Sequence, residues 1–364
     1  MQDFSFSHDT LAQRVVLDSG HVVERVIQET EELGIKKPMF ISTESAHDVA
    51  EKLVASLPPV KHWREVVQHV PRSVVDSATA AARDCEADGL ISIGGGSATG
   101  LAKAVALETS LPIIAVPTTY SASEATPIWG ITEDRTKTTG TNPIVLPAVV
   151  IYDADLLGTL PAKMAISSGL NALAHSVDSL WATNADPINR ALSLESARAL
   201  AVALRQLGEG ERRAREQALY GCYLAGVAFA SAGSGLHHKI CHVLGGTFNL
   251  PHAETHSVVL RYVAALNLPA VPETAKALAI ALEGEDAINA LNQLYHGVGA
   301  PKSLAELGMP EKGIAEAVER VLAAVPRGNP VKVTKENLTA LLSAAFHGDN
   351  PNSIDSQQVE RKVD

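Results

Sequence analysis

The pattern of apolar and polar positions divides the chain into two parts. Through about the first 155 residues, short apolar runs rich in β-branched residues alternate with stretches of helical periodicity, and Gly or Pro separates them. Such alternation is typical of a parallel α/β sheet, and runs that are apolar throughout are typical of strands covered on both faces. The predicted strands are residues 14–17, 38–42, 65–69, 90–93, 112–116 and 148–152, and the predicted helices are residues 22–33, 46–57, 74–85 and 98–107.

The pattern changes after Pro161. Long Ala- and Leu-rich stretches, such as residues 191–207 and 217–230, show no strand-like alternation, so this part is expected to be entirely helical. We therefore predict an α/β domain over residues 1–160 and an all-helical domain over residues 161–364. Stop signals divide the helical part at Gly208, Gly233, Pro251, Pro269, Gly297, Pro301 and Pro310.

Composition narrows the class of protein. The 364 residues are 46% hydrophobic and 20% charged, which is ordinary for a globular protein with two cores. The 41 Asp and Glu exceed the 30 Lys and Arg, and the net charge of -11 argues against a protein that binds nucleic-acid phosphates. No apolar run reaches the roughly 20 residues that a membrane span needs, and the first residues lack the layout of a signal peptide. We expect a cytoplasmic protein that binds neither membranes nor nucleic acids.

The cysteines and the histidines are distributed differently. Cys85, Cys222 and Cys241 are widely separated and form no CxxC pair, so we expect them to be reduced and to pack as small hydrophobic side chains. Of 13 histidines, however, five lie between positions 237 and 256. This clustering is the first sign of chemistry.

A glycine-rich turn follows one of the predicted strands. Residues 91–93 lead directly into Gly94, Gly95, Gly96 and Ser97, and a predicted helix comes next. Glycines let the backbone approach an anion closely, and the first N–H groups of a helix point at it. The alternative is a tight turn without a ligand, since the sequence is neither GxGxxG nor a Walker loop. We expect a phosphate cradle to which Ser97 adds a hydroxyl.

The next predicted strand ends in a hydroxyl-rich loop, residues 117–124, which reads PTTYSASE. Alone, such a loop is more often a solvated turn or a helix cap. Because ligands of open α/β sheets bind at the carboxyl edge of the strands, this loop and the glycine turn are expected to meet one ligand. A dinucleotide fits that pair of loops, with its pyrophosphate on the glycines and its nicotinamide beside the hydroxyls.

Polar side chains recur at helical spacing in the second part. Two side chains four residues apart in a helix lie on one face and can point to one site. A single HxxxH pair is a weak metal signal because it arises by chance, but the full set is stronger than its parts. The set comprises Asn171 and His175, in a helix expected to begin after Gly169, then His238 and His242, and, beyond an expected turn at Gly245 and Gly246, His252 and His256.

This set resembles an open metal site with one defect. Three imidazoles and an anionic ligand would suit a catalytic zinc or iron ion with an open coordination position. The position at which a carboxylate is wanted is Asn171, which carries an amide.

Together, the motifs resemble those of the iron-containing alcohol dehydrogenase family, also called group III alcohol dehydrogenases. The resemblance runs over nearly the whole chain. It implies a nucleotide-binding α/β domain, a helical metal-type domain, an active site in the cleft between them, and a homodimer. The motifs that carry it are the glycine turn at 94–97, PTT at 117–119, Lys137 sixteen residues before Asp153, SGLNALAH at 168–175, and the block from His238 to His252.

By this resemblance, four residues occupy the positions of the family's metal ligands: Asn171, His175, His238 and His252. His242 occupies the position of a histidine near the substrate. The family's usual Asp is replaced at Asn171, and a neutral amide is a poorer ligand than a carboxylate. We therefore predict that no metal is required.

Other positions resemble one branch of the family. Gly100 stands where many members carry Asp after the glycine turn, and the strings PTTYS at 117–121 and TPIWG at 126–130 are similar to those of the maleylacetate reductases. That branch is regarded as metal-independent and reduces maleylacetate to 3-oxoadipate with NADH or NADPH in the bacterial breakdown of hydroxyquinol, resorcinol and chlorinated aromatics. Two alternatives stay open: a metal-dependent alcohol or polyol dehydrogenase of the same family, and a nucleotide-binding protein without catalysis.

Reduction of an enone places particular demands on the site. Hydride addition leaves an enolate whose oxygen hydrogen-bond donors can stabilise. We hypothesise that His175, His238 and His252 provide donors or positive charge for the dianionic substrate, and that His242 is the proton donor or enolate partner, because the pKa of histidine lies near working pH.

The resemblance also assigns the cofactor contacts. The glycine turn is expected to hold the pyrophosphate, Thr118, Thr119 and Ser123 the nicotinamide side, and Lys137 the nicotinamide ribose. Thr43 stands where NAD-selective relatives carry Asp, and the neighbouring Glu44 could replace that carboxylate. We expect use of NADH with some acceptance of NADPH.

Four residues are candidates for contacting the substrate, a small dicarboxylate. They are Asn171, Tyr120, Arg261 and His347. The last three have ordinary alternatives, namely a packing aromatic residue, a surface ion pair and a solvated loop.

Overall fold

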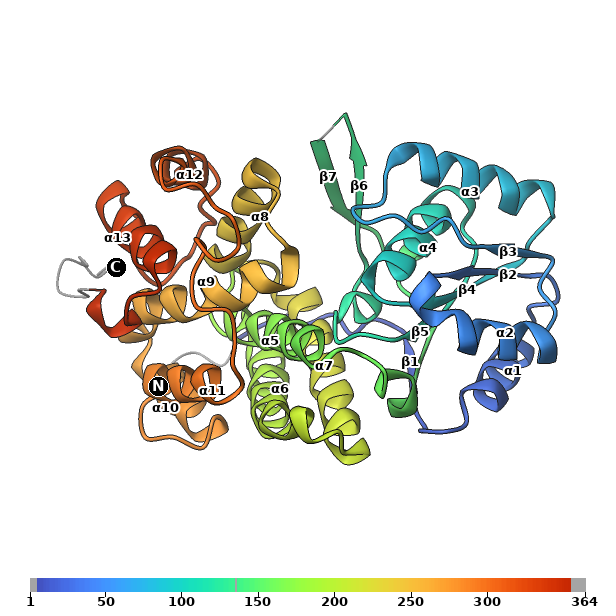
Figure 1. Cartoon of the computed structure of the whole chain (residues 1–364), viewed down its shortest axis with the longest axis horizontal. Helices are drawn as coiled ribbons and strands as arrows, with labels where there is room; N and C mark the ends of the chain where they lie inside the picture. The colour runs from blue at the N-terminus through green and yellow to red at the C-terminus, as the bar shows by residue number, and fades with distance from the viewer. Residues whose placement is uncertain (1–4, 135, 355–364) are drawn as a thin grey trace. The chain divides into compact units, whose positions relative to one another are not determined.

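Internal contacts group the chain into two units (Figure 1). The computed structural model describes residues 5–134 and 136–354. The α/β unit comprises Thr10–Pro161 and Gly210–Gly226, and the helical unit comprises Met1–Asp9, Ala162–Glu209 and Val227–Asp364. The chain thus passes between the units after Pro161, near the expected boundary. It also passes between them after Asp9, Glu209 and Gly226, which a single boundary at residue 160 does not describe.

A six-stranded sheet forms the centre of the α/β unit. All its paired strands are parallel, in the order β1-β8-β5-β4-β2-β3. The central strands β4 and β5 are buried along their whole length, which explains their uninterrupted apolar sequences. The strands are β1 (Arg14–Leu17), β2 (Pro38–Ser42), β3 (Lys61–Trp63), β4 (Gly89–Gly94), β5 (Ile113–Pro117) and β8 (Val149–Tyr152).

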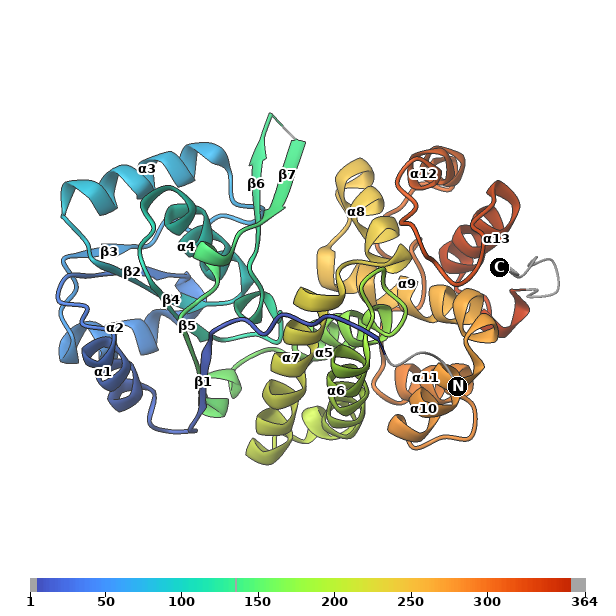
Figure 2. The same cartoon turned by 180° about the vertical axis from the view of Figure 1, so that it is seen from behind.

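Helices cover both faces of this sheet (Figures 1 and 2). Side chains alternate across a strand, so Met39 and Ile41 of β2 pack with α3 and α4, whereas Phe40 packs with α1 and α2. The α/β architecture is therefore confirmed. The helices are α1 (Val22–Glu32), α2 (His47–Ser56), α3 (Arg72–Asp84) and α4 (Gly96–Thr109).

One predicted strand is wrong, and one pair of strands was not predicted. The third strand is β3 and not residues 65–69, where the chain turns with positive φ at His69 and Val70. The hairpin of β6 (Ile128–Glu133) and β7 (Thr136–Thr141) forms a separate antiparallel sheet. The pattern does not predict this hairpin because β7 reads TKTTGT and contains no apolar residue.

The elements of the helical unit are α-helices and short 3₁₀ helices, as predicted; beyond them, the described residues include one isolated β-bridge residue, Val331. One core cluster of this unit joins α8, α9, α12 and α13. Helix α7 is divided between the two units after Gly226. The helices are α5 (Ala162–Ser179), α6 (Pro187–Gln206), α7 (Arg212–Ala232), α8 (Leu236–Phe248), α9 (His252–Asn267), α10 (Pro272–Ala281), α11 (Ala287–Gly297), α12 (Gly313–Leu322) and α13 (Lys335–His347).

Two expected helix breaks are absent. Helix α5 begins at Ala162, so Gly169 lies within the helix and does not precede it. A Cβ at Gly169 would come within 2.9 Å of Leu204 Cδ2 on α6. The glycine therefore allows close packing of the two helices. Gly245 and Gly246 likewise lie inside α8 and form no turn.

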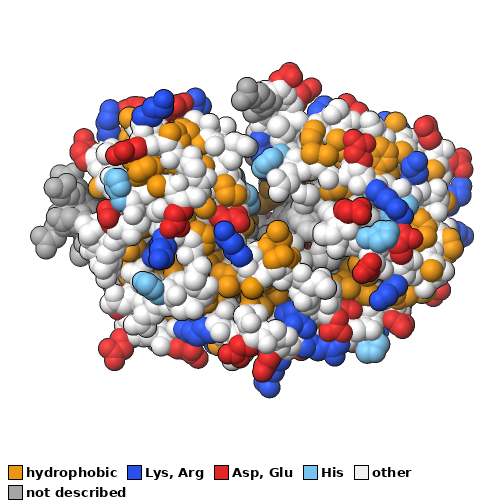
Figure 3. All heavy atoms as spheres, viewed as in Figure 1, with side chains coloured by type: hydrophobic (Ala, Val, Ile, Leu, Met, Phe, Trp, Pro, Cys, Tyr) orange, Lys and Arg blue, Asp and Glu red, His pale blue; other side chains and the backbone are white. Residues whose placement is uncertain are grey.

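Three further features concern surface and composition. In the described part of the chain, no single helix is long and apolar enough to cross a membrane, although the bent pair α7 and α8 passes that test together. On the face in Figure 3, Lys and Arg are interspersed with Asp and Glu. All three cysteines are free; Cys222 and Cys241 are buried, and Cys85 is half-buried.

Candidate active site

The glycine turn has the geometry of an anion cradle. Strand β4 ends at Gly94, whose φ of 147° disfavours any other residue, and α4 begins at Gly96. A Cβ on Gly94 would lie 2.6 Å from Thr43 Oγ1, so the predicted selectivity residue Thr43 does lie against the turn. Ser97 is half-buried in the first turn of α4. The first N–H groups of a helix that begins in a glycine turn suit a phosphate.

The hydroxyl-rich loop lies against the same turn. The N–H of Thr118 donates to the carbonyl oxygen of Gly94 at 3.0 Å, and a Cβ on Gly95 would meet Thr119 Cγ2 at 3.0 Å. Ser121 Oγ would similarly be 3.3 Å from a Cβ on Gly96. The two loops that the sequence assigned to one dinucleotide are therefore brought together, and they fit such a cofactor.

Ser123 lies within this loop, and Lys137 lies on β7 after it. Lys137 is an exposed side chain of β7, and desolvation by its surroundings lowers its pKa. Its Cε packs 2.9 Å from the place of a Cβ on Gly130. Its ribose contact stays a prediction, and so does the nicotinamide contact of Ser123.

A buried lysine ties these pieces together, and sequence reasoning missed it. Lys103 on α4 is fully buried, and its Nζ donates to the carbonyl oxygens of Ser123, Thr126 and Ile128 at 2.5, 2.7 and 3.0 Å. Burial lowers its pKa to about 7. Lys103 thus fixes the path from the hydroxyl-rich loop into β6. A signal existed, since only Lys103 and Glu108 are charged in α4.

Tyr120 is not placed to contact a substrate in this structure. Its side chain is fully buried, its hydroxyl has no hydrogen-bond partner among the described residues, and burial raises its pKa. The packing alternative is therefore correct for this residue.

Three helices bring the histidines of the helical unit together. His175 of α5 and His238 of α8 stack with ring centroids 4.9 Å apart, and His175 Nδ1 lies 2.7 Å from His238 Nε2. His242 and His252 are exposed beside them, the His242 ring 6.2 Å from that of His238. Phe229 of α7 covers the cluster, 4.3 Å from the His238 ring. The histidines that the sequence grouped do form one site.

Asp178, which sequence reasoning missed, anchors this cluster. It lies fully buried on α5, and its carboxylate accepts the backbone N–H of Gly235 at 2.8 Å and the Nδ1–H of His238 at 2.6 Å. Because Nδ1 of His238 donates to the carboxylate, Nε2 of that neutral ring accepts from His175 Nδ1. Asn171 Nδ2 then lies 3.5 Å from His175 Nε2. One chain of contacts runs from Asp178 to Asn171.

Burial sets the protonation of this chain. Desolvation lowers the pKa of His238 well below its ordinary range, and the nearby His175 adds to that effect. Desolvation also raises the pKa of Asp178, against the backbone N–H groups that favour its charged form. Two backbone N–H groups and an imidazole N–H point at the carboxylate of Asp178, so we assign this carboxylate as the acceptor of their hydrogen bonds.

A second layer of buried groups lies behind the first. His237 Nε2 is 3.0 Å from His256 Nδ1, and Cys241 Sγ is 3.7 Å from His237 Nε2. The ligand atoms of these three residues lie within 4.8 Å of one another. The other ring nitrogens, His237 Nδ1 and His256 Nε2, have no partner among the described residues, so they lack the support that metal-bound histidines usually have. The layer is better explained as a hydrogen-bonded pair that packs beneath His238 and His252.

The chemistry of the first layer fits a divalent metal poorly. Three imidazoles are suitable ligands, but the fourth is the neutral amide of Asn171, whose Oδ1 is buried without a partner among the described residues. The only carboxylate identified in the cluster, that of Asp178, binds His238 from behind. Among the described residues, the set therefore offers imidazole and amide ligands and no anionic one.

Two candidate substrate residues lie away from this cluster. Arg261 lies more than two turns along α9 from His252, in a separate pocket of the helical unit. His347 is exposed at the end of α13, where its ring packs on Phe346. Sequence alone does not show which face of a helix or which end of a unit such residues occupy, so neither is brought to the histidines.

Comparisons with known proteins agree with this geometry. The family model described as iron-containing alcohol dehydrogenase matches residues 12–154, and the model of the C-terminal part of that family matches residues 165–346. The maleylacetate reductase of Sphingobium indicum is 46% identical over 347 residues, covering 94% of this chain and 98% of that protein.

Two solved structures are also similar to this chain. An iron-containing alcohol dehydrogenase of Corynebacterium glutamicum is 48% identical, with a TM-score of 0.95 over 97% of this chain and 100% of that one. A maleylacetate reductase of Rhizobium sp. is 41% identical, with a TM-score of 0.91 over 96% of this chain and 100% of that one.

Proposed function

The chain belongs to the iron-containing alcohol dehydrogenase family, and we propose that it reduces the carbon–carbon double bond of maleylacetate, giving 3-oxoadipate, with NADH or NADPH as the reductant. It is an oxidoreductase. The observation that carries the proposal is the histidine cluster itself. An amide, Asn171, stands at the open end, and a buried carboxylate, Asp178, orients the imidazoles from behind.

The substrate explains why such a site suffices. An alcohol dehydrogenase must stabilise an alkoxide, for which a Lewis acid is the direct solution. In maleylacetate the double bond is conjugated to a ketone, so hydride addition at C2 moves an electron pair onto the C4 oxygen. The resulting enolate is stabilised by hydrogen-bond donors, and a proton then adds at C3. Reduced nicotinamide, when bound, supplies the hydride.

The residues divide these tasks. His242 and His252 are exposed at the mouth of the cluster, and we assign them to the enolate oxygen and to protonation of C3. His238 is buried and bonded at both ring nitrogens, which assigns it to positioning. Positive charge that forms on His175 is stabilised by Asp178 through His238.

The cofactor belongs to the α/β unit in this proposal. Gly94–Ser97 hold the pyrophosphate, Thr118, Thr119 and Ser123 the nicotinamide side, and Lys137 the ribose. The short, uncharged side chain of Thr43 beside the turn leaves room for a 2′-phosphate, while the exposed Glu44 repels it. This supports use of NADH with some acceptance of NADPH.

We further propose that the reaction needs no metal, because Asn171 offers a neutral amide and the carboxylate of Asp178 is engaged by His238. A cytoplasmic homodimer that serves bacterial breakdown of aromatic compounds is the setting we propose, by resemblance to the family.

The test is maleylacetate-dependent oxidation of NADH by the purified chain, with the product identified by mass spectrometry. Reduction of NAD⁺ by short alcohols and polyols is measured on the same preparation. The proposal expects turnover of maleylacetate to 3-oxoadipate and none above background with alcohols. The reverse result would assign the chain to the alcohol dehydrogenases of its family.

A further inference from the structure

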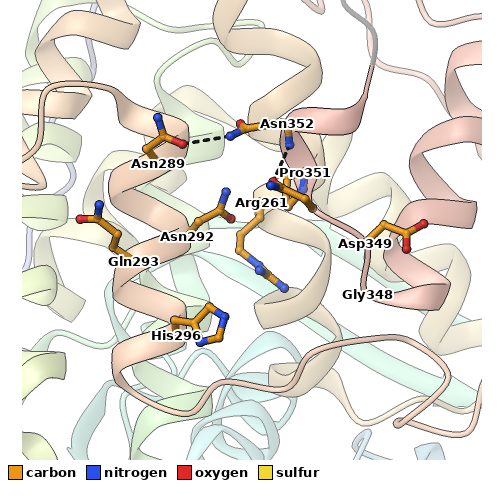
Figure 4. A pocket seen from close by; sticks show the side chains of 10 residues that line it. Arg261, Asn289, Asn292, Gln293, His296, Gly348, Asp349, Pro351 and Asn352 are labelled. Atoms are coloured by element: carbon orange, nitrogen blue, oxygen red, sulfur yellow. Dashed lines mark hydrogen bonds between the residues drawn. The ribbon is translucent and has the colours of Figure 1, made fainter.

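A second pocket lies in the helical unit, apart from the histidine cluster (Figure 4). Its volume of about 690 Å³ is within the range of small-molecule sites. None of the histidines assigned above contributes to it. The pocket lies between α9, α11 and the segment after α13, and it is lined by Arg261, Asn289, Asn292, Gln293, His296, Gly348, Asp349, Asn350, Pro351 and Asn352.

The wall of this pocket contains a cation without a counterion. Arg261 is half-buried, and no carboxylate of the described residues lies within 4.0 Å of its guanidinium. Its one hydrogen bond among the described residues is long, from Nη2 to the carbonyl oxygen of Lys302 at 3.4 Å, and its Nε is buried without a described partner. Desolvating a charge without pairing it is unfavourable, so the site favours an anionic group supplied from outside.

Aromatic rings hold this guanidinium in place. Its Cζ lies 5.5 Å from the ring centroid of Tyr262 and 5.1 Å from that of Tyr295. Such contacts orient a planar cation without neutralising it. The fork of N–H donors is therefore pre-organised for a planar, bidentate acceptor such as a carboxylate.

The rest of the pocket wall is rich in amides. Asn292 Oδ1 is buried without a described partner and needs a donor. Asn289 Oδ1 accepts from Asn352 Nδ2 at 2.9 Å, which fixes both side chains at the rim. Gln293 adds a further amide beside them. Amide side chains both donate and accept, so they suit hydroxyl groups.

From these contacts we propose that the pocket binds a small hydroxy acid with a single carboxylate. The carboxylate pairs with Arg261, and a hydroxyl donates to Asn292 Oδ1. Asp349, in the same wall, carries negative charge and disfavours a second carboxylate, whereas it accepts from a hydroxyl. This binding function goes beyond the proposed reductase activity.

The experiment is calorimetric titration of the full chain with gluconate, which has one carboxylate and several hydroxyls. Sorbitol has the hydroxyls without the carboxylate, and inorganic phosphate is an anion without the hydroxyls. We expect a single gluconate site, weakened about tenfold or more in Arg261→Gln and in Asn292→Asp, because each change removes or neutralises the pairing charge. Arg320→Gln is the matched control, since that exposed arginine of the same unit pairs with Glu316 at 2.8 Å.

Several results would overturn the proposal. Gluconate binding that is absent at millimolar concentration, or that is unchanged in both pocket variants, excludes the site. Phosphate or sorbitol binding as tight as gluconate excludes the ligand class. If Arg261→Gln raises KM for maleylacetate and leaves gluconate binding intact, Arg261 serves the substrate and not this pocket. Because gluconate binding is measured without turnover, failure here leaves the reductase proposal untouched.

Discussion

The glycine turn and the histidine cluster prepare for their ligands in different ways. The turn is made by adjacent residues at the end of one strand, where α4 begins and the side chains of Thr43, Thr119 and Ser121 pack closely against the glycines. The cluster draws side chains from α5, α8 and α9, and contacts within it run from Asp178 to Asn171. A change in the turn should therefore act locally on cofactor affinity, whereas a change anywhere in the cluster should reach the reacting groups.

The largest effect is expected at His242. Its replacement by Ala removes the proposed proton donor and should lower kcat about 10³-fold, within the range of general acid catalysis. KM for NADH should stay the same, because the cofactor loops belong to the other unit. Steady-state kinetics with maleylacetate measure both constants. His347→Ala is the control, since that exposed histidine ends α13; a loss there equal to that of His242→Ala would contradict the assignment.

A second prediction concerns the buried anchor. Asp178→Asn removes the acceptor for His238 Nδ1–H and frees the ring to change its tautomer, so kcat should fall about 10²-fold although Asp178 touches no substrate. Asp186→Asn is the matched control. That buried carboxylate caps α6, and Asn caps helices as well as Asp does. Equal losses in the two variants would point to general destabilisation. Nitrogen-15 shifts of the imidazoles would show the tautomer directly.

A change in the glycine turn, unlike one in the histidine cluster, should alter cofactor affinity more than kcat. In Gly94→Ala, the new Cβ would meet Thr43 Oγ1 at 2.6 Å with φ at 147°, so the loop must shift. KM for NADH should rise about tenfold with little change in kcat, as expected for a loss of uniform binding. NADH fluorescence titration gives the affinity without substrate. Gly297→Ala, where nothing lies within 4 Å of the new Cβ, should match the unchanged chain; an equal loss there would contradict a local effect.

The last prediction concerns the pH dependence of stability. His237, His238 and His256 are buried, and burial lowers their pKa values well below the ordinary value. The unfolded chain therefore binds protons that the folded chain does not, and the free energy of unfolding should fall as pH drops from about 7 to 5, by up to about 1.4 kcal/mol per pH unit for each histidine. The raised pKa of Asp178 changes the free energy of unfolding in the opposite direction, but it is one group against three histidines.

Urea unfolding followed by Trp181 fluorescence tests this slope. Trp181 lies buried in the helical unit, and replacing the other two tryptophans, Trp63 and Trp129, with Phe isolates its signal. His256→Asn should reduce the slope by about one proton. A slope that is the same in this variant and in the parent would show that the buried histidines do not titrate on unfolding.

The same difference, between a contiguous turn and a cluster drawn from several helices, explains which residues could be predicted from the sequence. The glycine turn is contiguous and its chemistry is local, so the motif predicted the turn between strand and helix, and the resemblance predicted Thr43 beside it. The histidines were predicted by helical spacing and resemblance. Asp178 was missed, although it lies three residues after His175 and thus on the same face of α5.

The burial of individual side chains was the property that the sequence did not reveal. Lys103 is an ordinary helical lysine in the sequence but is fully buried, and Tyr120 is buried where a loop contact was expected. Arg261 was a candidate for the substrate, with a surface ion pair as the alternative. Its side chain lies instead between two tyrosine rings in another pocket. The β6–β7 hairpin was missed because polar strands carry no alternation signal.

The central claim is that the histidine cluster reduces an enone without a metal. The most direct measurement is maleylacetate-dependent NADH oxidation by enzyme stripped with a strong chelator and verified free of metal, beside the same preparation with added zinc or ferrous iron. The account predicts full activity in the stripped enzyme and no gain on adding either metal. Activity that appears only with metal would show that Asn171 and the three histidines still form a working metal site, and would contradict the account.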